Sequence, residues 1–243
     1  MKQKKFTFQE LLMICACVAV VATLGISALN ANGTASAETA VCAGQQSKIF
    51  AAISSYASDN EGFLPYFDDE FSIPGCKTRV TWAYRIHEYL PEETGNKNYF
   101  CPSAQAAYAD PDNRSNMSSP RSCVSIPDRN LESYRFINYG INHEYAASNV
   151  GRWASKDPKQ YITVKMSAVV NPAEKVLVAD AWNGKNYGRN VITHYNAGSN
   201  KMNPCHGNAA NVLWFDGQVK KVDDPHKTLQ NGKNAAKHFR VDK

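Results

Sequence analysis

The sequence predicts an α+β protein in which a long N-terminal helix packs on a mostly antiparallel sheet that ends in a C-terminal β-hairpin. Three observations lead to this class. Residues 11–29 carry no charge, residues 49–57 place apolar side chains at helical spacing, and Asp216-Gly217 separates two β-prone runs near the end of the chain. The 243 residues are enough for a domain with its own core beyond the first helix.

The uncharged run of 19 residues is long enough to cross a bilayer as a helix. Three lysines precede it, as is typical of the cytoplasmic end of a membrane span. Glu10 stands at the start of the run, where an unpaired carboxylate costs free energy at the edge of the hydrocarbon. This acid therefore needs a partner.

The amphipathic segment beyond the run is expected to carry one apolar helical face. Its members follow the i, i+3, i+4, i+7 pattern and are Ile49, Phe50, Ile53, Tyr56 and Ala57. Asn60 and Gly62 are expected to end the helix. A second short helix is expected over residues 82–93, and the polar stretches 110–129 and 182–205 are expected to be surface loops.

A hairpin is expected where Asp216-Gly217 lies between residues 212–215 and 219–222. An Asp-Gly pair favours a type I′ turn, which needs positive φ at both central residues. His206 precedes this hairpin. It is expected either to hydrogen-bond the first strand or a nearby loop, or to join Asp180 as a pair of metal ligands.

The seven cysteines lack the CxxC spacing that is typical of zinc sites, so no metal is expected from their spacing. Two lie in the apolar run. If the remainder is exported, two disulfides and one free thiol are expected among the other five, in a pairing that the sequence leaves open. These five are Cys42, Cys76, Cys101, Cys123 and Cys205. Calcium is the alternative ion, because Asp68, Asp69 and Glu70 offer oxygen ligands, although without EF-hand spacing.

The sequence favours neither an enzyme nor a nucleic-acid-binding protein. It lacks G-x-S-x-G, H-E-x-x-H and phosphate-loop motifs. Cys205 and His206, as neighbours in a strand, would point to opposite faces. The net charge of +5 arises at the two ends of the chain, since residues 38–217 sum to −1 and carry no basic stripe that alternates with aromatic residues.

The first forty residues allow three interpretations. A secretory signal peptide would be cut after Ala35-Ser36-Ala37 and leave Glu38 as the first residue. A plain single-span anchor explains the lysines but not Glu10. The third interpretation follows from the stretch KKFTFQELL at residues 4–12.

KKFTFQELL resembles the N-terminal signature of type IV pilins and type II secretion pseudopilins, although Lys5 stands where Gly is usual and Phe8-Gln9 where Leu-Ile is usual. The resemblance implies that prepilin peptidase cuts between Lys5 and Phe6 and methylates the new amine of Phe6. It also implies that Glu10 pairs with the N-terminal amine of a neighbouring subunit, which would remove the cost of its charge.

Further landmarks occur in the order seen in one pseudopilin-like group whose members carry an H-x9-DG motif, here His206 and Asp216-Gly217. The other landmarks are residues 41–65, 99–103, 139–142 and 171–180. The resemblance implies a pilin-like fold. Its parts would be a leader (1–5), a transmembrane helix (6–30), a stalk (31–62), an exported globular domain (63–222) and a polar basic tail (223–243) that is expected to be loose.

The resemblance implies a structural subunit of the inner membrane with a cytoplasmic N-terminus and a periplasmic or extracellular body. Its partners would be prepilin peptidase, other pilin-like subunits, and secretion cargo or polysaccharide, and no cofactor is expected. The alternative is an anchored or secreted carbohydrate-interacting protein, because aromatic residues near loops can stack on sugars. These aromatic residues are Trp153, Tyr161, Trp182, Tyr187 and Tyr195.

Overall fold

A computed structural model describes residues 33–66, 68–73, 76–91, 98–105, 137–146, 163–184, 188–194, 200–231 and 235–240. The chain divides into two compact units, Met1–Ala37 and Glu38–Lys243. The predicted leader and membrane segment, with Lys5, Phe6 and Glu10, lie outside the described residues. Among the residues that are described, no helix combines the length and the apolarity needed to span a bilayer.

Helix α2, Gly33–Asp59, buries one face in the core of the larger unit. The buried members lie on one side of the helix and are Cys42, Gln46, Ile49, Ala52, Ile53 and Ala57. Phe50 and Tyr56 are partly buried against the same core. The predicted apolar stripe is therefore confirmed.

The end of α2 is set by two residues with positive φ, Glu61 at 54° and Gly62 at 85°. The Gly62 N–H donates to the Ala57 carbonyl at 2.7 Å, which is the closing bond of a Schellman-type helix end. This bond satisfies a carbonyl that the helix leaves without an internal partner. The predicted stop between residues 60 and 62 is confirmed.

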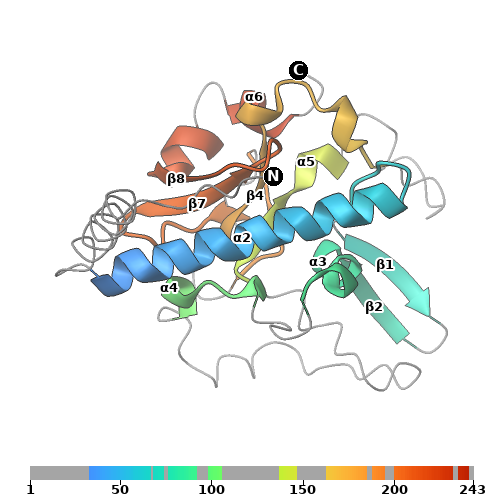
Figure 1. Cartoon of the computed structure of the whole chain (residues 1–243), viewed down its shortest axis with the longest axis horizontal. Coiled ribbons are helices and arrows are strands. Elements are labelled where there is room, and N and C mark those ends of the chain that lie inside the picture. Colours follow the sequence, from blue (N-terminus) through green and yellow to red (C-terminus); the bar gives the residue numbers. More distant parts are fainter. Residues whose placement is uncertain are drawn as a thin grey trace, which may run out of the picture. The chain divides into compact units, whose positions relative to one another are not determined.

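The main sheet has the strand order β5-β3-β4-β7-β8, and β6 pairs with β4 beside this path. All pairs are antiparallel except β3 with β5. The strands are β3 (Tyr139–Asn142), β4 (Val176–Trp182), β5 (Val191–Ile192), β6 (Lys201–Met202), β7 (Ala209–Trp214) and β8 (Val219–Asp223). Figure 1 shows α2 running across β4 and β7, and Ile49 and Ile53 share the core with Leu213.

Shorter elements surround this helix and sheet. β1 (Asp68–Ile73) and β2 (Cys76–Thr81) form a separate antiparallel pair. The helical segments are α3 (Trp82–Arg85), η1 (His87–Tyr89), α4 (Pro102–Gln105), α5 (His143–Ala146), η7 (Met166–Ala168), η8 (Pro172–Glu174), η9 (His226–Gln230) and α6 (Ala235–Phe239). The second short helix predicted over residues 82–93 thus corresponds to α3 followed by η1.

The hairpin between β7 and β8 differs in its turn from the prediction. The Gly217 N–H donates to the Trp214 carbonyl at 3.0 Å, and the Trp214 N–H donates to the Gln218 carbonyl at 2.9 Å. Positive φ occurs at Gly217 (87°) but not at Asp216. These features define a three-residue loop with a left-handed glycine, so the predicted type I′ turn is wrong. Instead, the Asp216 carboxylate accepts from the Gln218 N–H at 3.0 Å.

Two other expectations need correction. Residues 182–205, expected to be a surface loop, contain β5 and β6, and Ile192 and Met202 are buried. The tail after residue 222, expected to be loose, forms η9 and α6 and buries Phe239. The buried Gln230 amide donates to the Thr193 and Asn200 carbonyls. The segment after residue 222 is therefore hydrogen-bonded to the segment 182–205.

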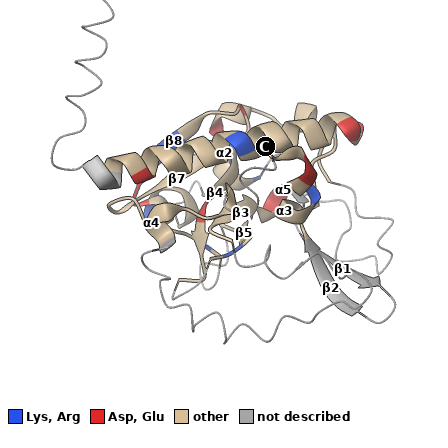
Figure 2. Cartoon of the chain, turned by 60° about the horizontal axis from the view of Figure 1, so that its bottom comes forward, with Lys and Arg blue, Asp and Glu red and all other residues tan. Residues whose placement is uncertain are grey.

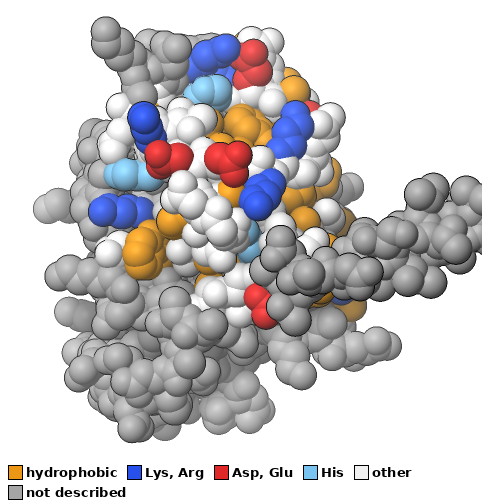
Figure 3. Space-filling view, turned by 90° about the vertical axis from the view of Figure 1, so that its left-hand side faces the viewer, with side chains coloured by type: hydrophobic (Ala, Val, Ile, Leu, Met, Phe, Trp, Pro, Cys, Tyr) orange, Lys and Arg blue, Asp and Glu red, His pale blue; other side chains and the backbone are white. Residues whose placement is uncertain are grey.

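The described surface mixes charges of both signs. On the face shown in Figure 3, basic and acidic side chains lie beside one another with hydrophobic side chains between them. Helix α2 carries three charged residues, Glu38, Lys48 and Asp59 (Figure 2). Of the large hydrophobic side chains that are described, Val41 on α2 and Val170 are about half exposed. The described surface therefore offers isolated apolar side chains rather than a broad apolar patch.

The Gly217 turn makes a testable contribution to stability. A Cβ at Gly217 would lie 2.7 Å from Cε1 of Phe50 on α2, and φ there is 87°. We expect Gly217→Ala to lower the free energy of unfolding by about 1–3 kcal/mol, measured by urea denaturation of the full chain in detergent. Gly207 has a φ of 67°, but a Cβ built there meets no atom within 4 Å. Gly207→Ala should therefore lower the free energy of unfolding by less than Gly217→Ala does.

Gly44, inside α2, has nothing within 4 Å of a built Cβ and serves as the matched control. Gly44→Ala should stabilise the protein by about 0.5–1 kcal/mol, because glycine is a poor helix former. Equal losses for Gly217→Ala and Gly207→Ala would show that the contact with Phe50 contributes nothing.

Candidate functional site

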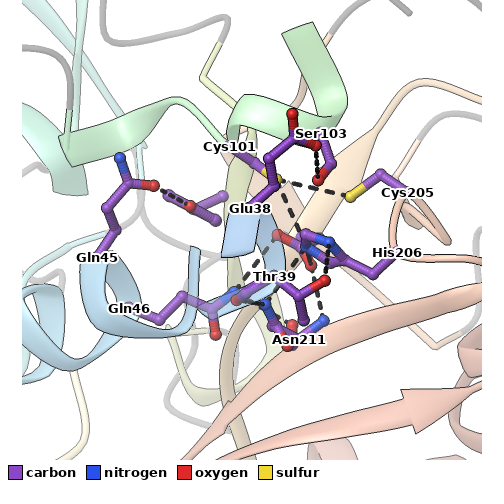
Figure 4. A network of polar contacts seen from close by, with 11 residues as sticks. Glu38, Thr39, Gln45, Gln46, Cys101, Ser103, Cys205, His206 and Asn211 are labelled. Carbon is purple, nitrogen blue, oxygen red and sulfur yellow. Dashed lines mark hydrogen bonds and ion pairs between the residues drawn. The ribbon is translucent and has the colours of Figure 1, made fainter. Parts of the chain in front are cut away.

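A polar cluster is buried between α2 and the sheet, with His206 beside Thr39 and Asn211 (Figure 4). Its centre is a contact between Asp180 on β4 and His206 before β7. Asp180 Oδ2 lies 3.2 Å from His206 Nε2, and both side chains are fully buried. Asp180 Oδ2 also accepts from the Asn211 N–H at 2.7 Å, and the Gln46 amide on α2 lies 3.5 Å from Oδ1. The antiparallel pairing of β4 with β7 brings the two sequence regions together.

A tight turn aims the His206 ring toward α2. Gly207 and Asn208 both have positive φ, 67° and 68°, and the His206 N–H donates to the Ala209 carbonyl at 3.0 Å. The other ring nitrogen, Nδ1, lies 3.1 Å from Thr39 Oγ1 on α2. The side chain of His206 therefore links the start of β7 to the N-terminal part of the helix.

Three free thiols surround this pair: Cys42 on α2, Cys101 before α4, and Cys205. Cys101 Sγ lies 3.8 Å from Cys205 Sγ and 3.4 Å from His206 Nε2. Cys42 and Cys101 are buried and Cys205 is partly buried. The segment that carries Cys101 is tied to α2 by the Ser103 hydroxyl, which donates to the Glu38 carboxylate at 2.9 Å.

The cluster shifts the titration of its members. Burial acts to lower the pKa of His206, but hydrogen bonds to the Asp180 carboxylate and to two thiols, together with the charge of Asp180, raise it from 6.5 to about 12. Burial raises the pKa of Asp180, whereas its contacts with His206 and with the Asn211 N–H act in the opposite direction. The imidazole is therefore held in its charged form at neutral pH.

The thiols are held in the protonated form. The hydrogen bond with Cys205 raises the pKa of Cys101 to about 11. The hydrogen bond with Cys101, followed by burial, raises the pKa of Cys42 well above its ordinary value. Because the thiolate is the nucleophile of cysteine chemistry, these shifts disfavour nucleophilic attack by either group.

The geometry of the cluster is also unlike a catalytic triad. Cys101 and Asp180 both contact Nε2 of His206, whereas a relay places the nucleophile and the acid on opposite ring nitrogens. What the cluster can do is bind a cation: one ligand atom from each of Cys101, Asp180, Cys205 and His206 lies within 4.8 Å of the other three.

The structure brings together some of the candidate residues from the sequence and separates others. The structure places His206 against Asp180, the two residues considered from the sequence as a pair of metal ligands, and Cys42, Cys101 and Cys205 lie beside them. Cys76 lies in β2, and Cys123 lies outside the described residues. Sequence reasoning missed Cys42 and Cys101, because its ligand search used local spacing and these residues come from separate segments. It also expected Cys205 and His206 to point to opposite faces of a strand, which is wrong, because both lie in a turn before β7 and their ligand atoms belong to one cluster.

The remaining candidates lie elsewhere. Asp68, Asp69 and Glu70 begin β1, and their side chains are outside the described part. Of the aromatic residues considered for sugar binding, Trp182 is described: it ends β4, is partly buried and pairs with Lys201 of β6. The other four, Trp153, Tyr161, Tyr187 and Tyr195, lie outside the described residues.

The H-x9-DG motif has a structural explanation in contacts with α2. His206 at one end of the hairpin strand contacts Thr39, and Gly217 at the other end lies against Phe50. The two contact points on α2, Thr39 and Phe50, are eleven residues apart. His206 and Gly217, which flank β7, are also eleven residues apart. Eleven residues of helix span about 16 Å. The motif thus attaches β7 to α2 at two points.

Comparisons of the chain with family models, with curated proteins and with solved structures found no match in any of the three.

The raised pKa of His206 predicts a pH-dependent stability. A group whose pKa rises on folding contributes fully below its unfolded pKa, here 6.5, and its contribution is lost as pH rises toward the folded value of about 12. We expect the difference in unfolding free energy between the wild type and His206→Gln to shrink from about pH 6 to about pH 9. Urea denaturation of both proteins at each pH, in the presence of a chelator and a reductant, measures this difference in unfolding free energy.

The Asp180→Asn background provides the control for this pH effect. Without the carboxylate, the His206→Gln substitution should have an effect that changes much less with pH. A wild-type difference that stays constant over the same pH range would contradict the role assigned to the pair.

Proposed function

We propose that the chain is a pilin-like subunit, held in the inner membrane, processed by prepilin peptidase and assembled into a pilus or pseudopilus for type II-like secretion or surface display. The observation that carries the proposal is Glu10 within KKFTFQELL, an acid at the start of a run of 19 uncharged residues. A signal peptide or a plain anchor does not explain why an acid stands at this position. Pairing of Glu10 with the amine of a neighbouring subunit explains it.

The physical basis is the cost of a charge at the membrane boundary. A carboxylate near the hydrocarbon costs free energy, and an opposite charge within hydrogen-bonding reach offsets that cost. Cleavage between Lys5 and Phe6 would create such a charge, the new amine of Phe6, four residues from Glu10. Pairing between the acid of one subunit and the amine of the next would then favour assembly in one register.

The docking of α2 supports a mechanical role. Helix α2 lies on the sheet through one continuous face and is held at Thr39 and Phe50 by the two ends of the hairpin strand. A helix held in this way moves together with the sheet as one body. In a polymer built through N-terminal helices, such an attachment carries the exported body along with the filament.

The mature N-terminus separates the three interpretations of the first forty residues. Mass spectrometry of chain extracted from membranes of cells with a prepilin peptidase should find N-methyl-Phe6 as the first residue. Cells that lack the peptidase should retain Met1 and serve as the control. Glu38 as the first residue would instead identify a signal peptide, and intact Met1 in both strains would identify a plain anchor.

Glu10→Gln tests assembly separately from insertion. Because the substitution removes the charge that the neighbouring amine would pair with, we expect the assembled fraction to fall by at least about tenfold, as a loss of about 1.4 kcal/mol produces. Cross-linking and shearing of filaments measure assembly, and carbonate extraction measures insertion, which should be unchanged. Gln9→Ala is the adjacent control and should assemble. Normal assembly of Glu10→Gln would overturn the proposal.

A further inference from the structure

The geometry points to a closed, four-ligand transition-metal site of the zinc class, formed by Cys101, Cys205, His206 and Asp180. It lies in the body of the protein, and the inference does not depend on pilin-like assembly. The ligand atoms are the two sulfurs, His206 Nε2 and a carboxylate oxygen of Asp180, and all of them lie within 4.8 Å of one another.

Three of the six distances between these atoms match the edges of a zinc tetrahedron, and the other three are within 4.8 Å. Usual zinc–ligand bond lengths give edges of about 3.8 Å between two sulfurs, about 3.6 Å between sulfur and nitrogen and about 3.4 Å between nitrogen and oxygen. The corresponding separations here are 3.8 Å for Cys101–Cys205, 3.4 Å for Cys101–His206 and 3.2 Å for His206–Asp180. Along these three edges a metal fits with little movement of the ligand atoms.

The donor set selects the kind of ion. Two thiolates and an imidazole favour zinc and similar soft or borderline cations, whereas calcium and magnesium require oxygen ligands. Four protein ligands with three of them buried leave no open position for substrate, which is the character of a structural site. Binding requires two thiolates and an Nε2 without its proton, so it would release the protons of Cys101 and Cys205 together with the Nε2 proton of His206.

The ligands already have supporting contacts. His206 Nδ1 faces Thr39 Oγ1, so the Nδ1–H can donate to that hydroxyl while Nε2 binds the metal. Asp180 Oδ2 accepts from the Asn211 N–H, and Oδ1 faces the Gln46 amide. Such contacts fix the orientation of ligating side chains and raise metal affinity.

A disulfide between Cys101 and Cys205 is the competing fate of the same thiols. It requires the sulfurs to approach to about 2.0 Å, well inside their present 3.8 Å. It would also leave the His206–Asp180 pair without a further role. The two fates exclude each other, because a sulfur in a disulfide cannot bind the metal as a thiolate, so a single preparation distinguishes them.

Cobalt substitution tests the inference. The full chain, purified in detergent under reducing and metal-free conditions, should bind one equivalent of Co²⁺ and develop a thiolate-to-cobalt charge-transfer band together with the intense visible bands of tetrahedral cobalt. Zn²⁺ should displace the cobalt and abolish these bands. Thr39→Val should keep the tetrahedral spectrum but lower zinc affinity by about 10–100-fold.

Cys205→Ser should lose about half of the charge-transfer intensity, because one of two thiolates is removed, and Cys76→Ser is the matched control that should change nothing. If Cys205→Ser does not fold, the wild-type spectrum still decides. Absence of a tetrahedral cobalt spectrum in the reduced wild type would overturn the inference. A Cys101–Cys205 disulfide without bound metal, in protein isolated from the cells that export it, would also overturn the inference. A Cys205→Ser variant with the same cobalt spectrum as the wild type would do so too.

Discussion

The buried contact between His206 and Asp180 is the interaction on which the arrangement of helix and sheet depends. Taking two charged groups out of water costs several kcal/mol per ion, so such a pair persists only where further polar partners surround it. Thr39 from α2 and the Asn211 N–H from β7 supply those partners. One contact therefore requires the helix, β4 and β7 to be in place together, and loss of any one of them would leave a charge buried alone.

The same cluster connects segments that are far apart in the sequence. Cys101 comes from the stretch before α4, Asp180 from the middle of β4 and Cys205-His206 from the turn before β7. A metal bound by these side chains would cross-link the chain over about half its length, so its binding free energy would contribute directly to folding. None of the four ligands lies on α2, so this link would stabilise the body beneath the helix, while α2 itself contacts the cluster through Thr39 and Gln46.

Local patterns in the sequence predicted the elements that local physics controls. The stripe from Ile49 to Ala57 follows the period of a helix, and Asp216-Gly217 marks a turn because glycine tolerates positive φ. The cluster could not be predicted in this way, since tertiary packing of a separate segment rather than sequence spacing brings Cys101 to His206. The short strands within residues 182–205 were missed for a related reason: buried Asn190 and Thr193 have the composition of a loop but lie inside the fold.

The two contacts that join α2 to the segment from His206 to Gly217 limit how this protein can change in length. An insertion or deletion of one residue between His206 and Gly217 would reverse the alternation of side chains along β7 and move one contact away from its helical partner. Compensation inside α2 would need a matching change, and that change would rotate the rest of the helix by about 100°. Related chains should therefore conserve the lengths of these two segments together, while their composition is free to diverge.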